Sequence, residues 1–463
     1  MIRLFRVFVP SSVVALLVSE AILIYTCYVL AAFLVLDVDP EVFLLYDSGW
    51  ARIAVVVACL MLAIYFQDLY TQLRIKSRIV LFQQVGLALG GAFLVQALLV
   101  YLRLRDLFLP TWLMIAGSAL TLVLLPWWRI LYVSVVIKAI GSERILFLGT
   151  SALVREIGAH MAEHPESGSV AIGSVEDEPE AGEIAGVKVL GKVADLRRIV
   201  AEWKPDRVVV GMKERRARLP VNQLLDIHLS GTPVEDAFNT YEATFGRIST
   251  RELRPAQLIF SSDLGPNPRR VMLQSIYSMV IAVFAAVLTA PLMLLVAIAV
   301  RLSSRGPALF RQQRVGKDNA VFTLYKFRSM YQNAESRSGA VWATKGDPRI
   351  TRVGKWLREL RLDELPQLFN VLRGEMSIVG PRPERPEFVA ELERRIPYYR
   401  QRLCIKPGIT GWAQINHKYG DTVEDSIAKL EYDLYYIKNL APALDAYIMF
   451  QTAKVMLLSR GSQ

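Results

Sequence analysis

The chain contains 463 residues, of which 53% are hydrophobic and 21% are charged, and its formal net charge is +11. This length accommodates about two to four domains, and the many apolar and many charged residues together predict alternating membrane and soluble parts. A basic protein can bind nucleic acid, but the sequence has no RNA- or DNA-binding motif, so we expect the positive charge to face anionic lipid instead. The three cysteines and four histidines show neither disulfide nor metal-ligand spacing, which argues against a zinc site.

The first 140 residues are rich in long apolar stretches. Four of these are candidates for membrane-spanning helices: residues 7–36, 53–66, 79–102 and 107–128. The first is longer than the apolar region of a cleaved signal peptide, so we expect it to remain as an anchor. Basic residues lie before the first stretch, between the second and third stretches, and after the fourth stretch, where Arg129 is one of them. The loop after the first stretch is acidic instead. We therefore predict a four-helix transmembrane block over residues 1–140 with both ends in the cytoplasm.

Glu20 lies well inside the first apolar stretch. A carboxylate within a membrane segment is a candidate for function. No partner for it is visible in the sequence, and a hydrogen bond between helices or a contact in a dimer is the interpretation we favour.

A small parallel α/β unit is predicted for residues 141–245, because strand-like and helical segments alternate there. The strands are expected at 143–150, 169–175, 187–190 and 206–211, and the helices at 151–162, 193–203 and 220–229. We expect a cytoplasmic Rossmann-like domain. Its glycine pattern is reduced to Gly149 and Gly158, which are too far apart for a dinucleotide-binding loop, so a regulatory or assembly role is favoured over NAD binding.

Residues 246–270 are interrupted by prolines and polar residues and are predicted to be a linker, whereas residues 271–300 contain no charge. A straight helix of that length would measure about 45 Å, against a hydrocarbon core of about 30 Å, and Pro291 lies inside it. A crossing would place everything after it outside the cell, away from nucleotide-activated substrates. We therefore expect a re-entrant membrane helix hairpin over 271–302, broken at Pro291; an ordinary fifth crossing is the alternative.

A basic, strand-like segment follows at 310–330. Its positive side chains are Arg311, Arg314, Lys317, Lys326 and Arg328. Because the segment begins directly after the membrane helix, these charges should lie at the headgroup surface, where they could bind anionic lipid or hold phosphates by charge-assisted hydrogen bonds. A basic amphipathic helix is predicted next, over residues 349–361.

Two adjacent acids, Asp363 and Glu364, come directly before Pro366 and a run of apolar residues at helical spacing. The acids should therefore lie at a helix N-terminus, where the helix dipole favours negative charge. The helix should end at Gly374, and a short strand should lead to the rigid turn 380–383, Gly-Pro-Arg-Pro. Paired carboxylates facing a fixed arginine suit a phosphate ester and a divalent cation; a solvated, capped helix is the alternative for an acid pair taken alone.

Two further segments complete the chain. Residues 405–415 contain a Pro-Gly turn and a second glycine, which is typical of a loop that shapes a substrate site. Residues 435–459 have an apolar face interrupted by Asp445, which predicts a helix in the plane of the membrane interface rather than across it. A plain packing helix is an equal alternative.

The segment from about 268 to 463 resembles the bacterial sugar transferase family of monotopic polyprenyl-phosphate glycosyl-1-phosphate transferases. The matching motifs are LFRQQRVG, YKFRSM, RLDELPQLFNVLRGEMSIVGPRPERPE and KPGITGWAQI, in this order. The helical block and the α/β unit resemble the large-form members, which commonly serve exopolysaccharide or O-antigen assembly. Residues 250–264 and 339–345 are also similar to the subgroup associated with exosortase-linked loci.

This resemblance implies an α/β catalytic domain over 271–463 and a two-step transfer. Asp363 would attack the sugar-proximal phosphate of a UDP-sugar, expel UMP and hold the phospho-sugar covalently, and undecaprenyl phosphate would then accept it. Glu364 would help to hold Mg²⁺ or handle the lipid phosphate, so Asp363 and Glu364 are the predicted metal ligands. The residues expected to bind substrate phosphates are Lys326, Arg328, Arg382, Pro383, Arg311 and Arg314.

The resemblance also implies a bacterial inner-membrane protein whose catalytic domain faces the cytoplasm. The lipid bilayer is an expected partner, nucleic acid is not, and a homodimer is expected. Many family members have Ser before the hairpin proline, whereas this chain has Ala290, and Thr289 could replace that serine by bonding a backbone carbonyl. The alternatives are a nucleotide-sugar epimerase or dehydratase, which would need a Tyr-x-x-x-Lys pair absent from 143–245, and a non-catalytic scaffold.

Overall fold

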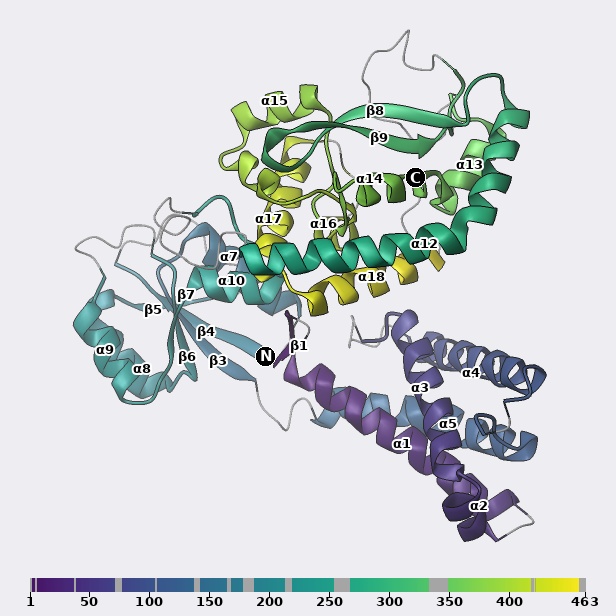
Figure 1. The fold of residues 1–463 in the computed structure, drawn as a ribbon. Helices are drawn as coiled ribbons and strands as arrows, with labels where there is room; N and C mark the ends of the chain where they lie inside the picture. The colour runs from purple at the N-terminus through teal and green to yellow at the C-terminus, as the bar shows by residue number, and fades with distance from the viewer. Residues whose placement is uncertain are drawn as a thin grey trace. The chain divides into compact units, whose positions relative to one another are not determined.

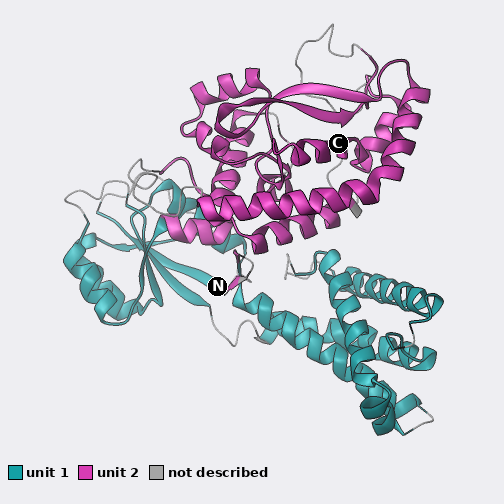
Figure 2. Cartoon of the chain, in the orientation of Figure 1, with its two compact units in different colours: residues 1–2, 8–237 teal, residues 3–7, 238–463 magenta. Residues whose placement is uncertain are grey.

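The computed structural model describes residues 2–4, 6–36, 39–70, 77–104, 106–136, 142–164, 168–177, 187–212, 219–253, 267–332, 349–417, 420 and 422–457. The chain divides into two compact units (Figure 2), which are residues 1–2 with 8–237 and residues 3–7 with 238–463. The finer division at residues 140, 245 and 270 stays a prediction. The subgroup similarity at 339–345, and at 254–264 of the segment 250–264, lies outside the described residues.

The first unit begins with helices of strongly apolar sequence. They follow the short paired strands β1 (Ile2–Leu4) and β2 (Val7–Val9) and are α1 (Ser11–Val35), α2 (Pro40–Tyr46), α3 (Gly49–Phe66), α4 (Arg78–Tyr101) and α5 (Thr111–Leu131), which continues into the π-helical turn η1 (Tyr132–Val136). α1, α3, α4 and α5 are long and apolar enough to cross a membrane, and they coincide closely with the four predicted stretches. Outward-facing side chains such as Leu34 and Leu94 are 73% and 75% exposed, as expected of helices that are apolar on all sides.

Glu20 has a partner that the sequence interpretation missed. Arg129 lies inside α5 rather than in the loop after it, so counting Arg129 among the loop charges was wrong. Its Nε and Nη2 donate to the two carboxylate oxygens of Glu20 over 2.7 and 2.8 Å. The hydroxyl of Tyr70 donates to the same carboxylate over 2.6 Å. Because Glu20 is completely buried, this ion pair joins α1 to α5 inside the helical block.

The remainder of the first unit is a five-stranded parallel sheet, which confirms the predicted parallel α/β unit. Its strands are β3 (Glu143–Leu148), β4 (Ser169–Val175), β5 (Val189–Gly191), β6 (Arg207–Val210) and β7 (Val234–Asp236). They lie in the order β5-β4-β3-β6-β7 (Figure 1). The associated helices are α7 (Ala152–Glu163), α8 (Leu196–Trp203), which follows the 3₁₀ turn η3 (Val193–Asp195), and α9 (Val221–Leu229). The three-residue β7 was not predicted because it is too short to show an alternating pattern.

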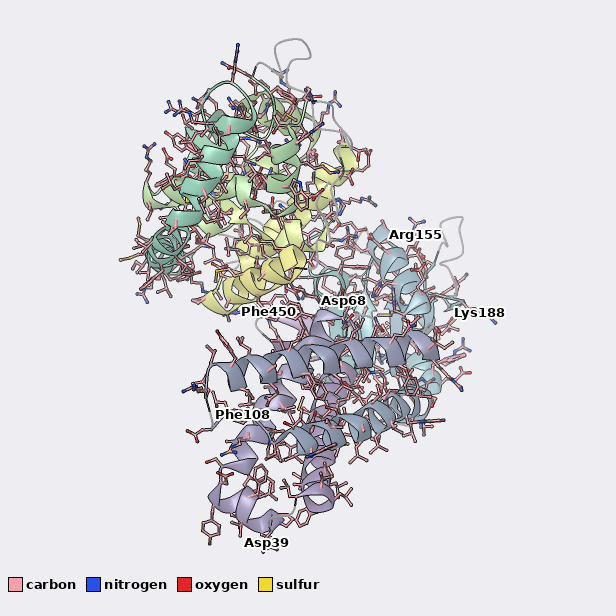
Figure 3. All side chains as sticks on the ribbon, turned by 90° about the vertical axis from the view of Figure 1, so that its right-hand side faces the viewer. Asp39, Asp68, Phe108, Arg155, Lys188 and Phe450 are labelled. Atoms are coloured by element: carbon pink, nitrogen blue, oxygen red, sulfur yellow. The ribbon has the colours of Figure 1, made fainter. Side chains whose placement is uncertain are left out.

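The second unit contains α12 (Pro268–Ser303), which is one helix of 36 residues through Pro291. The prediction of two helices separated by a break at Pro291 was therefore wrong at the level of secondary structure, because a proline removes one hydrogen bond and bends a helix without having to end it. Figures 1 and 3 show that α12 bends strongly along its length. The Thr289 hydroxyl donates to the Ala285 carbonyl over 2.7 Å, which confirms the backbone bond expected of this residue in place of a serine.

The other elements of the second unit pack around α12. An antiparallel hairpin is formed by β8 (Leu309–Val315) and β9 (Val321–Phe327), with the turn η4 (Lys317–Asn319) between them, and a short parallel pair by β10 (Ser377–Val379) and β11 (Gly408–Thr410). The helices and 3₁₀ turns are α10 (Ala237–Phe245), α13 (Arg352–Glu359), η5 (Leu362–Glu364), α14 (Gln367–Leu372), α15 (Pro386–Arg395), η6 (Tyr399–Cys404), α16 (Trp412–Asn416), α17 (Val423–Asn439) and α18 (Pro442–Leu457). Phe322 and Leu324 of β9 pack with Ala282 of α12 and Leu368 of α14, so the hairpin and the acid-pair segment share one core with the membrane-type helix.

Residues 435–459 do not form one interfacial helix. α17 ends at Asn439 and α18 begins at Pro442, because proline starts a helix readily but is excluded from its interior. Asp445 is completely buried, and its carboxylate accepts hydrogen bonds from Tyr277, from Tyr436 over 2.7 Å and from Gln274 over 3.0 Å. Burial raises the pKa of Asp445, and these three hydrogen bonds partly offset the rise. The structure favours the packing-helix alternative.

Candidate active site

The acid pair lies on the 3₁₀ turn η5, which connects α13 to α14. Leu362 and Leu365 on either side of it pack into the apolar cluster that contains Val300 of α12 and Leu357 of α13, and these anchors fix the turn. Asp363 and Glu364 therefore lie just before α14 rather than on its first turn. Negative charge is still favoured there by the start of a helix.

Glu364 is held by positive side chains. Its Oε1 lies 3.1 Å from Lys326 Nζ and 3.0 Å from a terminal nitrogen of Arg382, and its Oε2 lies 4.0 Å from Arg361. Burial acts to raise the pKa of Glu364, but the charges of Lys326, Arg382 and Arg361 outweigh it and hold the pKa well below its usual range. The Glu364 carboxylate is therefore stabilised in its ionised form, and its contacts hold Lys326 and Arg382 close to Asp363.

Asp363 has a different environment from its neighbour. Within the described ranges its carboxylate has no hydrogen bond and no ion pair. Burial and the charge of Glu364 raise its pKa, and Lys326, Arg358 and Arg382 oppose the rise. A carboxylate of raised basicity whose oxygens are uncommitted can attack an electrophilic phosphorus atom or bind a cation.

The predicted phosphate-binding residues separate into two groups. Lys326 and Arg382 both contact Glu364, and their charges also act on Asp363. Pro383 and Arg314 lie beside Arg382, but the Arg314 guanidinium is turned toward the turn itself: it donates to the Pro383 carbonyl over 2.9 Å and to Gln312 over 2.6 and 3.0 Å.

Arg311 and Arg328 contact groups other than the acid pair. Arg311 pairs with Tyr325 in the hairpin register, whereas Lys326 is opposite Phe310, and successive strand residues point to opposite faces. Arg311 therefore lies over the Tyr325 ring on the outer face, 5.8 Å from the ring centre.

Arg328 closes the C-terminal end of α12. Its guanidinium is buried and donates to the carbonyls of Val300, Ser304 and Arg305 over 3.3, 2.7 and 2.9 Å. A cation near the last carbonyls of a helix satisfies acceptors that have no partner within the helix. The structure thus gives Arg328 a capping role, and its predicted role in phosphate binding has no support from this position.

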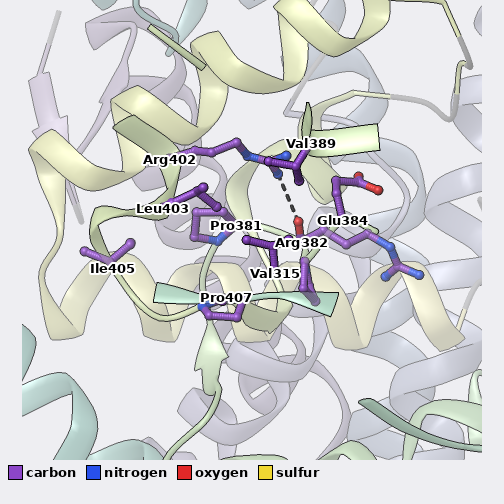
Figure 4. A pocket seen from close by; sticks show the side chains of 11 residues that line it. Val315, Pro381, Arg382, Glu384, Val389, Arg402, Leu403, Ile405 and Pro407 are labelled. Atoms are coloured by element: carbon purple, nitrogen blue, oxygen red, sulfur yellow. Dashed lines mark hydrogen bonds between the residues drawn. The ribbon is translucent and has the colours of Figure 1, made fainter. Parts of the chain in front are cut away.

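A second arginine, Arg402, contacts the turn that carries Arg382. Arg402 donates to the Arg382 carbonyl over 3.0 Å (Figure 4) and forms a buried ion pair with Asp433. Sequence reasoning missed both residues, because they lie 20 and 51 positions beyond Arg382 in segments without a distinctive motif. The pocket between Arg402 and the turn has a volume of only about 10 Å³, roughly one water, so it is not a substrate site.

A divalent cation at the acid pair would find few protein ligands. The described residues contain no cluster of three or more His, Cys, Asp or Glu side chains suited to a metal. The available donors are the Asp363 oxygens and Glu364 Oε2, since Oε1 faces Lys326 and Arg382. Such a donor set fits Mg²⁺, which retains water and needs only one or two carboxylates together with substrate phosphates.

Comparison with known proteins agrees with the resemblance that the sequence motifs show. Residues 269–459 match the family described as "Bacterial sugar transferase". The chain is 40% identical over 289 residues to UDP-N-acetylgalactosamine-undecaprenyl-phosphate N-acetylgalactosaminephosphotransferase of Aeromonas hydrophila, covering 62% of this chain and 63% of the relative. It is 38% identical over 267 residues to UDP-glucose:undecaprenyl-phosphate glucose-1-phosphate transferase of Klebsiella pneumoniae, covering 57% of each.

A shorter relative is matched almost throughout. The exopolysaccharide production protein PSS of Rhizobium leguminosarum bv. phaseoli is 43% identical over 182 residues, which cover 38% of this chain and 90% of the relative. In contrast, the matched part of this chain spans less than two thirds of the length of the Aeromonas and Klebsiella relatives.

Proposed function

Because this chain belongs to the bacterial sugar transferase family, we propose that it transfers a sugar-1-phosphate from a UDP-sugar to undecaprenyl phosphate, giving undecaprenyl-diphospho-sugar and UMP. The names of the Aeromonas and Klebsiella relatives support this donor and acceptor. The observation that carries the proposal is the uncommitted Asp363 carboxylate beside Glu364, Lys326 and Arg382.

The proposed reaction has two balanced steps. An oxygen of Asp363 attacks the sugar-proximal phosphorus, the bond from that phosphorus to the bridging oxygen breaks, and UMP leaves with the electron pair. A phosphate oxygen of undecaprenyl phosphate then attacks the same phosphorus and releases the Asp363 carboxylate. The nucleophile is a carboxylate in the first step and a phosphate in the second, so neither step needs a separate base to generate it.

Lys326 and Arg382 would stabilise the transferring phosphoryl group, because charge builds on its oxygens in the transition state. We propose Mg²⁺ as the cofactor, held by Asp363 and Glu364 Oε2 together with substrate phosphates and water. When bound, Mg²⁺ would offset the negative charge of the diphosphate.

We also propose that α12 is a re-entrant membrane helix that bends near Pro291 and enters and leaves the same leaflet of the inner membrane, so that the acid pair faces the cytoplasm. The bend of α12 and its exposed apolar side chains, such as Phe284 at 73% and Leu288 at 82%, support contact with lipid. A Rossmann-like α/β domain, a homodimer and a role in exopolysaccharide or O-antigen synthesis complete the proposal; the name of the Rhizobium relative supports the exopolysaccharide alternative.

The direct test is UMP release by the full chain in membranes, assayed with a panel of UDP-sugars and undecaprenyl phosphate. At least one donor is expected to give continuous UMP release, and the same donor without acceptor should give at most one UMP per chain. Absence of UMP with every donor, from protein shown to be folded, would reject the proposed function.

The metal proposal predicts a specific effect of Glu364→Gln. Loss of one charged ligand should raise the Mg²⁺ concentration needed for half-maximal activity by roughly tenfold, because a hard cation prefers an ionised oxygen. The measurement is UMP release after chelation and titration back with Mg²⁺. Glu391→Gln, which removes an exposed ion pair with Arg395, is the matched control and should titrate like the unchanged protein. An unshifted titration for Glu364→Gln would show that Glu364 is not a ligand.

A further inference from the structure

Two arginine side chains donate hydrogen bonds to two successive carbonyl groups of the turn that carries Arg382. Arg402 donates to the carbonyl of Arg382 over 3.0 Å, and Arg314 donates to the carbonyl of Pro383 over 2.9 Å. Prolines at 381 and 383 restrict the backbone locally, but they do not fix where the turn lies relative to η5. The guanidinium contacts supply that restraint.

Arg402 is itself rigidly held. It is 6% exposed, and its Nε and a terminal nitrogen lie 3.0 and 2.9 Å from one oxygen of Asp433, which is 1% exposed. The other terminal nitrogen donates to the Tyr399 hydroxyl over 2.6 Å. With every guanidinium nitrogen engaged, the planar group has a single orientation, which a flexible lysine ammonium could not reproduce.

Stability alone does not account for this ion pair. Burying two charges costs about as much as their attraction returns, and apolar replacements of similar volume are often neutral or stabilising. The Arg382 carbonyl is the acceptor that lies outside the Arg402–Asp433–Tyr399 cluster. On the other side of the same residue, the Arg382 side chain reaches Glu364 Oε1 at 3.0 Å.

We infer that Arg402, oriented by Asp433, is a positioning residue for the proposed transfer: it fixes the backbone of Arg382 so that the Arg382 guanidinium stays beside Lys326 and Asp363. The inference rests on the proposed function for its kinetic consequence. It assigns to Arg402 no contact with substrate. A small displacement of a positioned group can cost about 100-fold in rate.

The test replaces the ion pair by apolar side chains, Arg402→Met with Asp433→Leu, in the full chain. The kcat/KM for the UDP-sugar is expected to fall by about 10- to 100-fold while the midpoint of thermal unfolding stays within a few degrees. In an Arg382→Ala background the same pair of substitutions should change kcat/KM less than about twofold, because neighbouring residues that act together are non-additive. An equal loss in both backgrounds would overturn the inference. Arg402→Lys, which keeps a charge opposite Asp433, should show the same non-additivity with a smaller loss.

A second readout does not depend on activity. Hydrogen exchange of the backbone amides of the non-proline residues in 380–385 should accelerate in the apolar variant. It should remain unchanged in the control Arg400→Met, whose exposed side chain pairs with Glu393 off the turn. Unchanged exchange in the apolar variant would overturn the inference. If the unaltered protein released no UMP while exchange behaved as expected, the proposed function would fail and the restraint of the turn by Arg402 would stand.

Discussion

Replacing Asp363 by Asn is expected to lower the turnover of UDP-sugar by at least about 10⁴-fold, the order of loss seen when the nucleophile of a covalent mechanism is removed. An amide oxygen is a far weaker nucleophile than a carboxylate and cannot form a stable acyl phosphate. The substitution is nearly isosteric, and the Asp363 carboxylate has no hydrogen bond within the described ranges. The fold should therefore survive, and the loss should be chemical.

Two measurements check this prediction. Radiolabelled sugar phosphate should no longer pass to polyprenyl phosphate in membranes that contain the Asn variant. Mass spectrometry of unaltered protein quenched with donor alone should find a phospho-sugar on the peptide containing Asp363. Asp318→Asn, at the exposed hairpin turn where the side chain is 74% accessible, should retain full activity. Normal transfer by Asp363→Asn, or an unmodified peptide from competent protein, would refute the covalent mechanism.

The parts of the site that were predictable are those encoded locally. Proline before an apolar helical repeat predicted a helix after the acid pair, which lies on η5 just before α14, and glycine at 374, with φ of 76°, follows the end of that helix as expected. The interleaved pattern of 310–330 predicted strands, and the structure has a hairpin there. In each case the signal lies within one short continuous stretch of the chain, which is the range over which side-chain spacing reports backbone conformation.

The sequence did not indicate that the arginines of this segment have different roles. The sequence alone predicts one phosphate-binding group that contains Arg311, Arg314 and Arg328 together with Lys326. Because side chains alternate along β8, Arg311 and Arg314 lie on opposite faces of the hairpin. Arg328 instead donates to a carbonyl at the C-terminal end of α12. Charge composition carries no information about which acceptor a guanidinium will meet.

Long-range partners were equally hidden. Arg402 and Asp433 meet only because η6 and α17 pack together, and the carboxylate of Asp445 reaches the hydroxyl of Tyr277 on α12 across 168 positions. These polar groups are buried, so each had to find a partner in the tertiary structure. The most consequential such pair is Glu20 with Arg129, 109 positions apart.

Replacing Arg129 by Met is expected to destabilise the helical block by about 3–5 kcal/mol, since removing one member of a buried ion pair leaves the other charge uncompensated. Glu20 is completely buried, and among the residues that the structure describes it would retain only the Tyr70 hydroxyl as a partner. The double variant Glu20→Met with Arg129→Met should recover most of the loss, because both charges then disappear together. Denaturation of the full chain in detergent, followed by helical circular dichroism, provides the comparison.

The rescue separates two explanations that the single variant confounds. If Arg129 stabilises mainly by neutralising Glu20, the double variant must be more stable than Arg129→Met alone. If Arg129 instead contributes mainly by packing its stem or by its bond to the Leu69 carbonyl at 3.3 Å, the double variant will be no better than the single one. The exposed pair of Asp47 and Arg52 provides the scale: its aspartate is 59% accessible, and Asp47→Asn should cost less than about 1 kcal/mol. A carboxylate in the centre of an apolar helix is tolerated only because an arginine on a neighbouring helix meets it there, so the effect of removing Arg129 should depend on whether Glu20 is present.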